Sequence, residues 1–205
     1  MLCFFETYSM KRAFIFFAAA VLFMSPVAFA GGKNNKKKTE TPQSAVAVAR
    51  ISDVEIHWMT LEQAEAAMKT NPKKVWIDIY TDWCGWCKVM DKKTFSNPYV
   101  AQYMNEHFYA VRLNAEQQDS ISFLGQKYGL IEGSRTNRLV IEMLGPDHLS
   151  YPTGIYMDEN FKGAMPIPGY QDVAAMEMIL KYLVQGINKT TPFPVYQKNF
   201  KASWL

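Results

Sequence analysis

The amino-acid sequence predicts an α/β fold in which a central mixed β-sheet is flanked by helices. From about residue 51, strand-length apolar runs alternate with segments of helical periodicity, which is the pattern of β–α–β units. Later, residues 153–157 and 163–167 flank a polar turn at 158–160 and predict a hairpin, so the sheet gains antiparallel strands. Apolar residues make up 49% of the 205 residues, which is enough for a core without disulfide cross-links.

Local signals place the individual elements along the chain. Thr60 and Gln63 have the spacing of a capping box, so a helix begins there. Residues 75–80 form an apolar run of strand length, typical of a buried central strand. Pro98 is acceptable in the first turn of a new helix. In chain order we expect a strand at 54–59 and helices at 60–71, 84–95 and 98–108, then a strand at 109–114 and helices at 120–128, 138–144 and 173–183.

The N-terminus has the features of a secretory signal. Lys11 and Arg12 precede an unbroken apolar run from Ala13 to Met24, and Ala28–Ala30 has the small-x-small pattern of a cleavage site. We therefore predict a signal peptide at residues 1–30 and a periplasmic or secreted protein. The alternative is an uncleaved membrane anchor, because an apolar segment of this length is near the lower limit for a span.

Composition divides the rest of the chain. Residues 31–50 are polar and contain a lysine triplet, which predicts a flexible linker. Residues 51–187 form the expected folded domain. Residues 188–205 form a C-terminal extension whose aromatic side chains we expect to pack on that domain. The net charge is only +3, without basic residues spread over a folded face, so no nucleic-acid partner is expected.

The two cysteines that follow the predicted signal, Cys84 and Cys87, close too small a loop to stabilise a large fold, which indicates a chemical role. They lie where a strand meets a helix. A thiol at a helix N-terminus is favoured as thiolate, so we expect Cys84 to attack and the less exposed Cys87 to resolve the mixed disulfide. A zinc site needs four ligands, and His57, His107 and His148 have no ligand spacing, so no metal is expected.

Residues 75–88 resemble the active-site strand and helix of the thioredoxin family, and the similarity extends over roughly residues 52–186. The resemblance implies the thioredoxin fold, with an insertion at about 131–149. It also implies that Asp78 is a buried acid that accepts the proton of Cys87, with its pKa raised by burial. Pro152 matches the cis-proline of the family, which would expose the backbone of Tyr151 to an extended substrate.

The same resemblance implies a substrate groove beside the cysteine pair, lined by Trp83, Gly85, Trp86, Lys88 and Tyr151, with Pro152 at its base. The redox-active cysteine pair would be the only redox group, without a separate cofactor. A partner backbone could approach closely at the glycine. Exposed aromatic side chains indicate a binding surface.

From these features we expect an exported thiol–disulfide oxidoreductase that reduces protein disulfides and receives electrons from a membrane-bound thiol donor. Reduction is favoured over oxidation because no histidine stands between the cysteines. One alternative is a dedicated reductant in cytochrome c maturation. Another is a binding or chaperone module for extended polypeptides, in which the thiols are incidental.

Overall fold

The computed structural model describes residues 54–204. The predicted signal peptide and linker lie outside the described residues. In the described part of the chain, no helix has the length and apolar character needed to cross a membrane.

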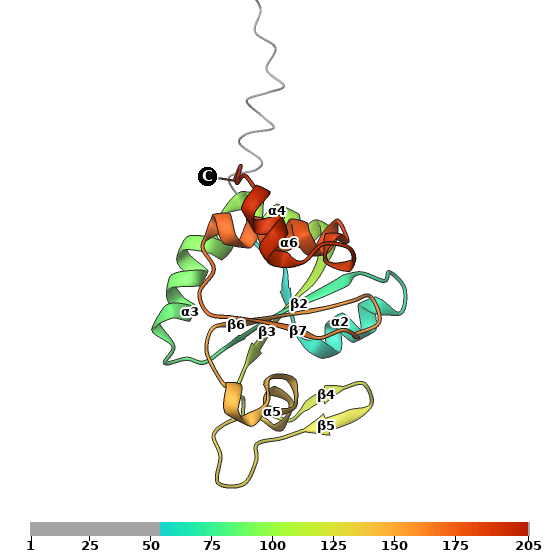
Figure 1. Cartoon of the computed structure of the whole chain (residues 1–205). Coiled ribbons are helices and arrows are strands. Elements are labelled where there is room, and N and C mark those ends of the chain that lie inside the picture. Colours follow the sequence, from blue (N-terminus) through green and yellow to red (C-terminus); the bar gives the residue numbers. More distant parts are fainter. Residues whose placement is uncertain (1–53, 205) are drawn as a thin grey trace, which may run out of the picture. The chain divides into compact units, whose positions relative to one another are not determined.

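A five-stranded mixed sheet forms the centre of the domain (Figure 1), in the spatial order β1, β3, β2, β6, β7. Strands β1, β3 and β2 run parallel, whereas β6 is antiparallel to β2 and β7 is antiparallel to β6. The strands are β1 (Trp58–Met59), β2 (Lys74–Tyr80), β3 (Phe108–Asn114), β6 (Thr153–Met157) and β7 (Met165–Pro168). The predicted mixed sheet flanked by helices is therefore confirmed.

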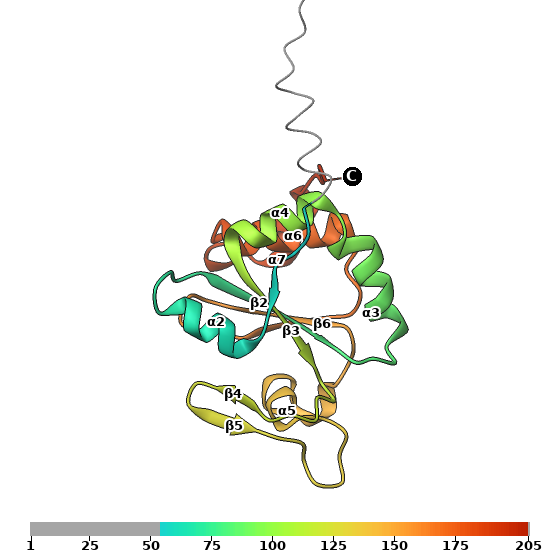
Figure 2. The same ribbon diagram turned by 180° about the vertical axis from the view of Figure 1, so that it is seen from behind.

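Helices cover both faces of this sheet, as the two opposite views show (Figures 1 and 2). One face packs against α2, α5 and the small hairpin of β4 (Ile121–Phe123) and β5 (Gln126–Tyr128), and the other against α3, α4, α6 and the C-terminal segment. The helices are α2 (Leu61–Met68), α3 (Gly85–Met90), α4 (Pro98–His107), α5 (Arg138–Leu144), α6 (Val173–Val184) and α7 (Phe193–Asn199).

The side chains of strand β2 point alternately to the two faces of the sheet, and this alternation decides on which face Asp78 lies. Val75, Ile77 and Ile79 point into the core beneath α2 and α5. Trp76 lies in the opposite core, beneath α4 and α6. Because successive strand residues face opposite sides, Asp78 shares the face of Trp76, where α3 also lies.

The capping box at the start of α2 is confirmed, since the Thr60 side chain accepts from the Gln63 amide and the Gln63 side chain accepts from the Thr60 amide. The predicted break before α4 is also confirmed: Asn97 caps the helix and Pro98 occupies its first turn. The expected helix at 84–95 consists of α3 and a π-helical turn, η1 (Asp91–Phe95).

The predicted helix at 120–128 is wrong. This segment is a hairpin of β4 (Ile121–Phe123) and β5 (Gln126–Tyr128). Leu124 and Gly125 have φ values of 51° and 78°, which form a tight left-handed turn that a helix does not contain. Two α2 carboxylates, Glu62 and Glu65, accept hydrogen bonds from amides of the hairpin, so contacts distant in sequence decide its conformation.

The predicted strand at 54–59 is shorter than expected, since only β1 pairs with the sheet. The preceding residues are instead held by the side chain of Asn105 on α4. Its Oδ1 accepts from the His57 amide at 2.8 Å, and its Nδ2 donates to the Glu55 carbonyl at 2.8 Å. A side chain therefore takes the place of a neighbouring strand.

The C-terminal segment packs on α6 and α4. The carboxylate of Glu177 is buried, and it accepts hydrogen bonds from the amides of Ser203 and Trp204 at 2.7 and 2.9 Å. The Trp204 ring is itself buried and lies 5.1 Å from the ring of Tyr103 on α4.

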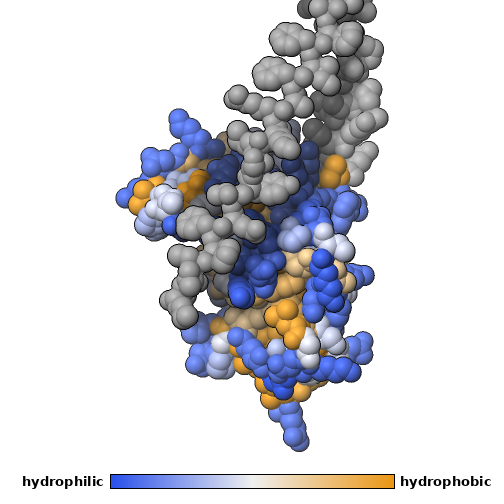
Figure 3. All heavy atoms as spheres, turned by 90° about the vertical axis from the view of Figure 1, so that its right-hand side faces the viewer, coloured by the Kyte–Doolittle hydropathy of each residue, from blue (hydrophilic) through white to orange (hydrophobic). Residues whose placement is uncertain are grey.

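Figure 3 shows another face of the domain, where apolar side chains gather toward the β4–β5 end among hydrophilic ones.

Candidate active site

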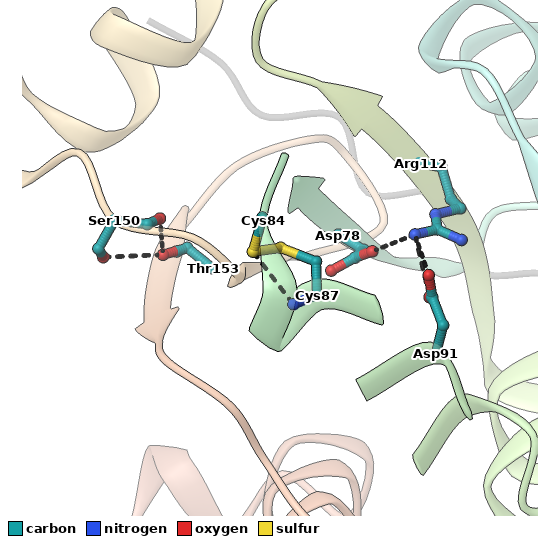
Figure 4. The surroundings of a disulfide bond; sticks show 7 residues. All are labelled: Asp78, Cys84, Cys87, Asp91, Arg112, Ser150 and Thr153. Carbon is teal, nitrogen blue, oxygen red and sulfur yellow. Dashed lines mark hydrogen bonds and ion pairs between the residues drawn. A yellow bond between two sulfur atoms is a disulfide. The ribbon is translucent and has the colours of Figure 1, made fainter. Parts of the chain in front are cut away.

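The two cysteines form a disulfide at the start of α3 (Figure 4). Cys84 is the N-cap residue of the helix, and its Sγ accepts a hydrogen bond from the Cys87 amide at 3.0 Å. The Cys84 amide donates to the Thr81 carbonyl at 3.1 Å, which joins the helix start to the end of β2. The sulfur that caps the helix therefore lies among the unpaired amides that favour a thiolate.

The exposures of the two cysteines differ less than the sequence predicts. Cys84 is 4% exposed and Cys87 is 3% exposed. The reason is that the Cys84 side chain turns inward to cap the helix and is bonded to Cys87. In the disulfide form, exposure therefore does not distinguish the two cysteines.

Asp78 is buried behind the disulfide, with 2% of its surface exposed. Burial disfavours the carboxylate and raises the pKa of Asp78 to about 7, although the Arg112 guanidinium opposes that rise and Asp91 adds to it. Figure 4 shows its carboxyl group between the cysteine pair and Arg112. A carboxyl group with this pKa can exchange a proton near neutral pH.

Arg112 and Asp91 belong to the site, and the sequence analysis did not identify them. Nη2 of Arg112 lies 3.3 Å from Oδ2 of Asp78 and 3.0 Å from Oδ1 of Asp91, so one guanidinium bridges two carboxylates. The Arg112 guanidinium also lies over the rings of Trp58 and Tyr80, at 5.1 and 4.5 Å from their centroids. The signal available from sequence was register: Arg112 is the direct neighbour of Asp78 on the parallel strand β3.

The loop before β6 faces the cysteine pair. The Tyr151–Pro152 peptide bond is cis, as the resemblance implies. The Thr153 hydroxyl donates to the Ser150 carbonyl at 2.7 Å, which closes this turn (Figure 4). The Pro152 carbonyl accepts from the Gly169 amide at 2.8 Å, so the loop after β7 lies beside it.

Two pairs of aromatic rings include the residues that directly precede the two cysteines, Trp83 and Trp86. Trp83 lies edge to face on Tyr151 with ring centroids 5.9 Å apart, and Trp86 lies against Tyr170 at 5.4 Å. The two tryptophans are nevertheless 61% and 62% exposed. A Cβ added at Gly85, between them in sequence, would have no neighbour within 4 Å, so the space above this residue is open.

Lys88 lies just beyond the second cysteine and is exposed. The structure places the nine predicted site residues on β2, in the turn between β2 and α3, on α3 and in the loop before β6. Within residues 54–204, no group of three or more potential ligand side chains is arranged to hold a metal ion.

The sequence is similar to those of known proteins. A family model described as Thioredox_DsbH, protein of unknown function, DUF255, matches residues 38–184. The thiol:disulfide interchange protein DsbD of Haemophilus influenzae is 30% identical over 149 residues, which are 70% of this chain and 22% of DsbD. An uncharacterized protein of Caenorhabditis elegans is 25% identical over 109 residues, which are 52% of this chain and 15% of that protein. The chain therefore spans about a fifth of these relatives or less.

A solved structure gives the same fold. A thioredoxin-fold protein from Helicobacter pylori superimposes with a TM-score of 0.51 at 16% identity, and the match covers 73% of this chain and 93% of that chain. At this identity the likeness shows the fold alone. The thioredoxin fold that the resemblance implies is therefore confirmed.

Proposed function

Since the chain has the thioredoxin fold and belongs to the family described as Thioredox_DsbH, we propose that it is a thiol–disulfide oxidoreductase that reduces disulfide bonds of exported proteins. The observation that carries the proposal is the Cys84–Cys87 disulfide at a helix start, backed by a buried carboxyl group with a pKa of about 7. The cysteine pair performs the exchange and the carboxyl group is placed to accept the proton of Cys87, whereas binding alone needs neither group. The redox-active cysteines supply the electrons, so the proposal includes no separate cofactor.

The proposed reaction has two exchange steps. The Cys84 thiolate attacks one sulfur of the partner disulfide, and the partner's other sulfur leaves and takes up a proton. Cys87 then loses its proton to Asp78 and attacks the Cys84 sulfur. The second partner thiol leaves with a proton, and the enzyme disulfide remains. Two electrons and two protons pass to the partner, and a thiol donor, proposed to be membrane-bound, returns them to the enzyme.

The two residues between the cysteines support the proposed direction of exchange. A strongly oxidising pair needs strong stabilisation of its thiolate, as in DsbA. Here the residues between the cysteines are Gly85 and Trp86, which carry no charge. The proposed flow of electrons is therefore from this protein to its partner.

The glutathione equilibrium tests the direction. We expect the reduction potential of the Cys84–Cys87 pair to lie nearer to that of thioredoxin, about −270 mV, than to that of DsbA, about −120 mV. The fraction of reduced protein is measured by alkylation and mass spectrometry over a series of glutathione ratios. A potential close to the DsbA value would mean that the protein is an oxidant.

Export is part of the proposal and is supported by the signal-like N-terminus. We expect the mature protein from bacterial cells to begin at Gly31. Mass spectrometry of the N-terminal peptide in the periplasmic and membrane fractions measures this directly. A full-length protein recovered with the membranes would favour the uncleaved anchor instead.

Two other roles remain open to test within the same experiments. A binding or chaperone module is supported by the two exposed tryptophans, but it needs neither the thiols nor Asp78. A dedicated reductant in cytochrome c maturation uses the same chemistry on a narrower set of partners. Activity on several unrelated protein disulfides favours the broader role.

A further inference from the structure

The surface around the disulfide continues along α3 as a strip of basic side chains. Lys88, Lys92 and Lys93 follow the cysteine pair on α3 and η1, and all three are exposed. Among residues 54–204, none of the three ammonium groups forms an ion pair. The neighbouring carboxylate, Asp91, is instead bound by Arg112. This lysine strip is therefore an unneutralised positive surface next to the redox centre.

The aromatic pair nearest the lysine strip is held in place by two different elements. Tyr170, which contacts Trp86, stands between Gly169 and Gln171. The Gly169 amide donates to the Pro152 carbonyl at 2.8 Å, and the Gln171 carbonyl accepts from the Thr94 hydroxyl at 2.7 Å. The loop is thus fastened on one side to the cis-proline turn and on the other to η1.

Each exposed tryptophan packs against a tyrosine, which restricts its ring in the unbound protein and favours its use as a binding surface. A tryptophan ring loses little conformational entropy on binding when a neighbour already restricts it. Trp86 lies in the first turn of α3, and Trp83 directly precedes Cys84, the N-cap of α3. We therefore expect an extended chain bound across the disulfide to contact both pairs.

We propose that the partner is an extended polypeptide whose half-cystine has apolar neighbours and nearby acidic residues. The apolar side chains pack against the Trp83–Tyr151 and Trp86–Tyr170 pairs, and the carboxylates face the lysine strip. Charge complementarity of this kind raises association rates more than it lowers dissociation rates. The inference rests on the proposed function, because it specifies the substrates of the same cysteine pair.

Matched disulfide peptides test this inference with the reduced full-length protein in single-turnover reactions. Each peptide carries phenylalanine beside its cysteine. The four peptides carry either two glutamates or two lysines, placed on either the N-terminal or the C-terminal side of the cysteine. At low ionic strength we expect the better acidic peptide to react about tenfold faster than its lysine counterpart, since steering of this kind changes association rates by about tenfold or more. The preference should shrink in about 0.5 M salt, where exposed charges are screened.

Variants assign the preference to the lysine strip. The double variant Lys92→Glu, Lys93→Glu should lose or invert the preference. Lys69→Glu with Lys127→Glu makes the same change of net charge at exposed lysines on other elements, and should keep it. If the wild-type protein reduces acidic and basic peptides at equal rates, the inference is overturned.

A small neutral disulfide tests the proposed activity separately from the proposed preference for acidic partners. Bis(2-hydroxyethyl) disulfide has no side chains for the aromatic pairs and no charge for the lysine strip. If the wild-type protein reduces it but does not discriminate between the peptides, the proposed function stands and the partner inference fails. If it reduces neither this compound nor any peptide, the proposed function fails as well.

Discussion

Replacing Cys84 by serine is expected to lower the rate of protein-disulfide reduction by about a thousandfold or more, because the attacking sulfur is lost. Replacing Cys87 by serine should abolish turnover but leave the first step intact, since Cys84 still caps the start of α3. The Cys87→Ser protein should therefore accumulate as a mixed disulfide with its partners. Non-reducing electrophoresis and mass spectrometry of the adducts measure both outcomes.

A control substitution at the third cysteine shows whether the loss of activity is specific to Cys84 and Cys87. Cys3→Ser removes a cysteine from the predicted signal peptide and should leave the activity of the mature protein unchanged. The order of the two thiols is tested independently by alkylating the reduced wild-type protein near neutral pH. If Cys87 is labelled faster than Cys84, the assigned roles are reversed.

Sequence alone predicts the parts of the fold that depend on short-range signals. The capping box at Thr60 and the start of α4 at Pro98 are local arrangements of side chain and backbone, and both are present. The bounds of α5 at 138–144 match the prediction because Asn137 caps the helix and Gly145 follows its last residue. The buried central strand is recognisable because a mostly apolar run of only six residues has the length and composition of a buried parallel strand.

The β4–β5 hairpin was not predictable in the same way. Its sequence contains apolar residues at spacings that suit either a helix or a strand, and only the turn at Leu124–Gly125 distinguishes them. The carboxylates of Glu62 and Glu65 on α2 stabilise the hairpin from some 60 positions away in the chain. No local pattern in the sequence contains such contacts.

The residues of the candidate site also fall into those that the sequence identifies and those that only the structure identifies. The cysteine pair, Asp78 and Pro152 lie at spacings that resemble a known family, so the sequence identifies them. Arg112 becomes recognisable only when the register of β2 and β3 places it beside Asp78. Likewise, the contact of Trp86 with Tyr170 joins residues on separate elements. Residues that tune the site from neighbouring elements therefore require the three-dimensional structure.

The environment of Asp78 predicts a large, pH-dependent effect on stability. Its pKa is raised from 3.8 to about 7, so the folded state binds a proton that the unfolded state releases at neutral pH. The contribution of Asp78 to stability is fully present below about pH 4 and is lost as the pH rises toward 7. At pH 8, Asp78→Asn should therefore stabilise the oxidised protein by up to about 4 kcal/mol.

Urea unfolding of the oxidised wild-type and Asp78→Asn proteins at pH 4 and pH 8 measures this effect. The difference between the two proteins should be large at pH 8 and small at pH 4, because an uncharged Asp78 resembles the amide. Arg112 keeps Asp91 as its partner in the variant, so the substitution does not leave an unpaired guanidinium. Asp119→Asn removes an exposed carboxylate and controls for the loss of one surface charge. If the variant is equally stable or less stable than the wild type at pH 8, the buried Asp78 carboxylate does not destabilise the folded protein. The proposed role of Asp78 as proton acceptor for Cys87 would then lose its physical basis, the raised pKa.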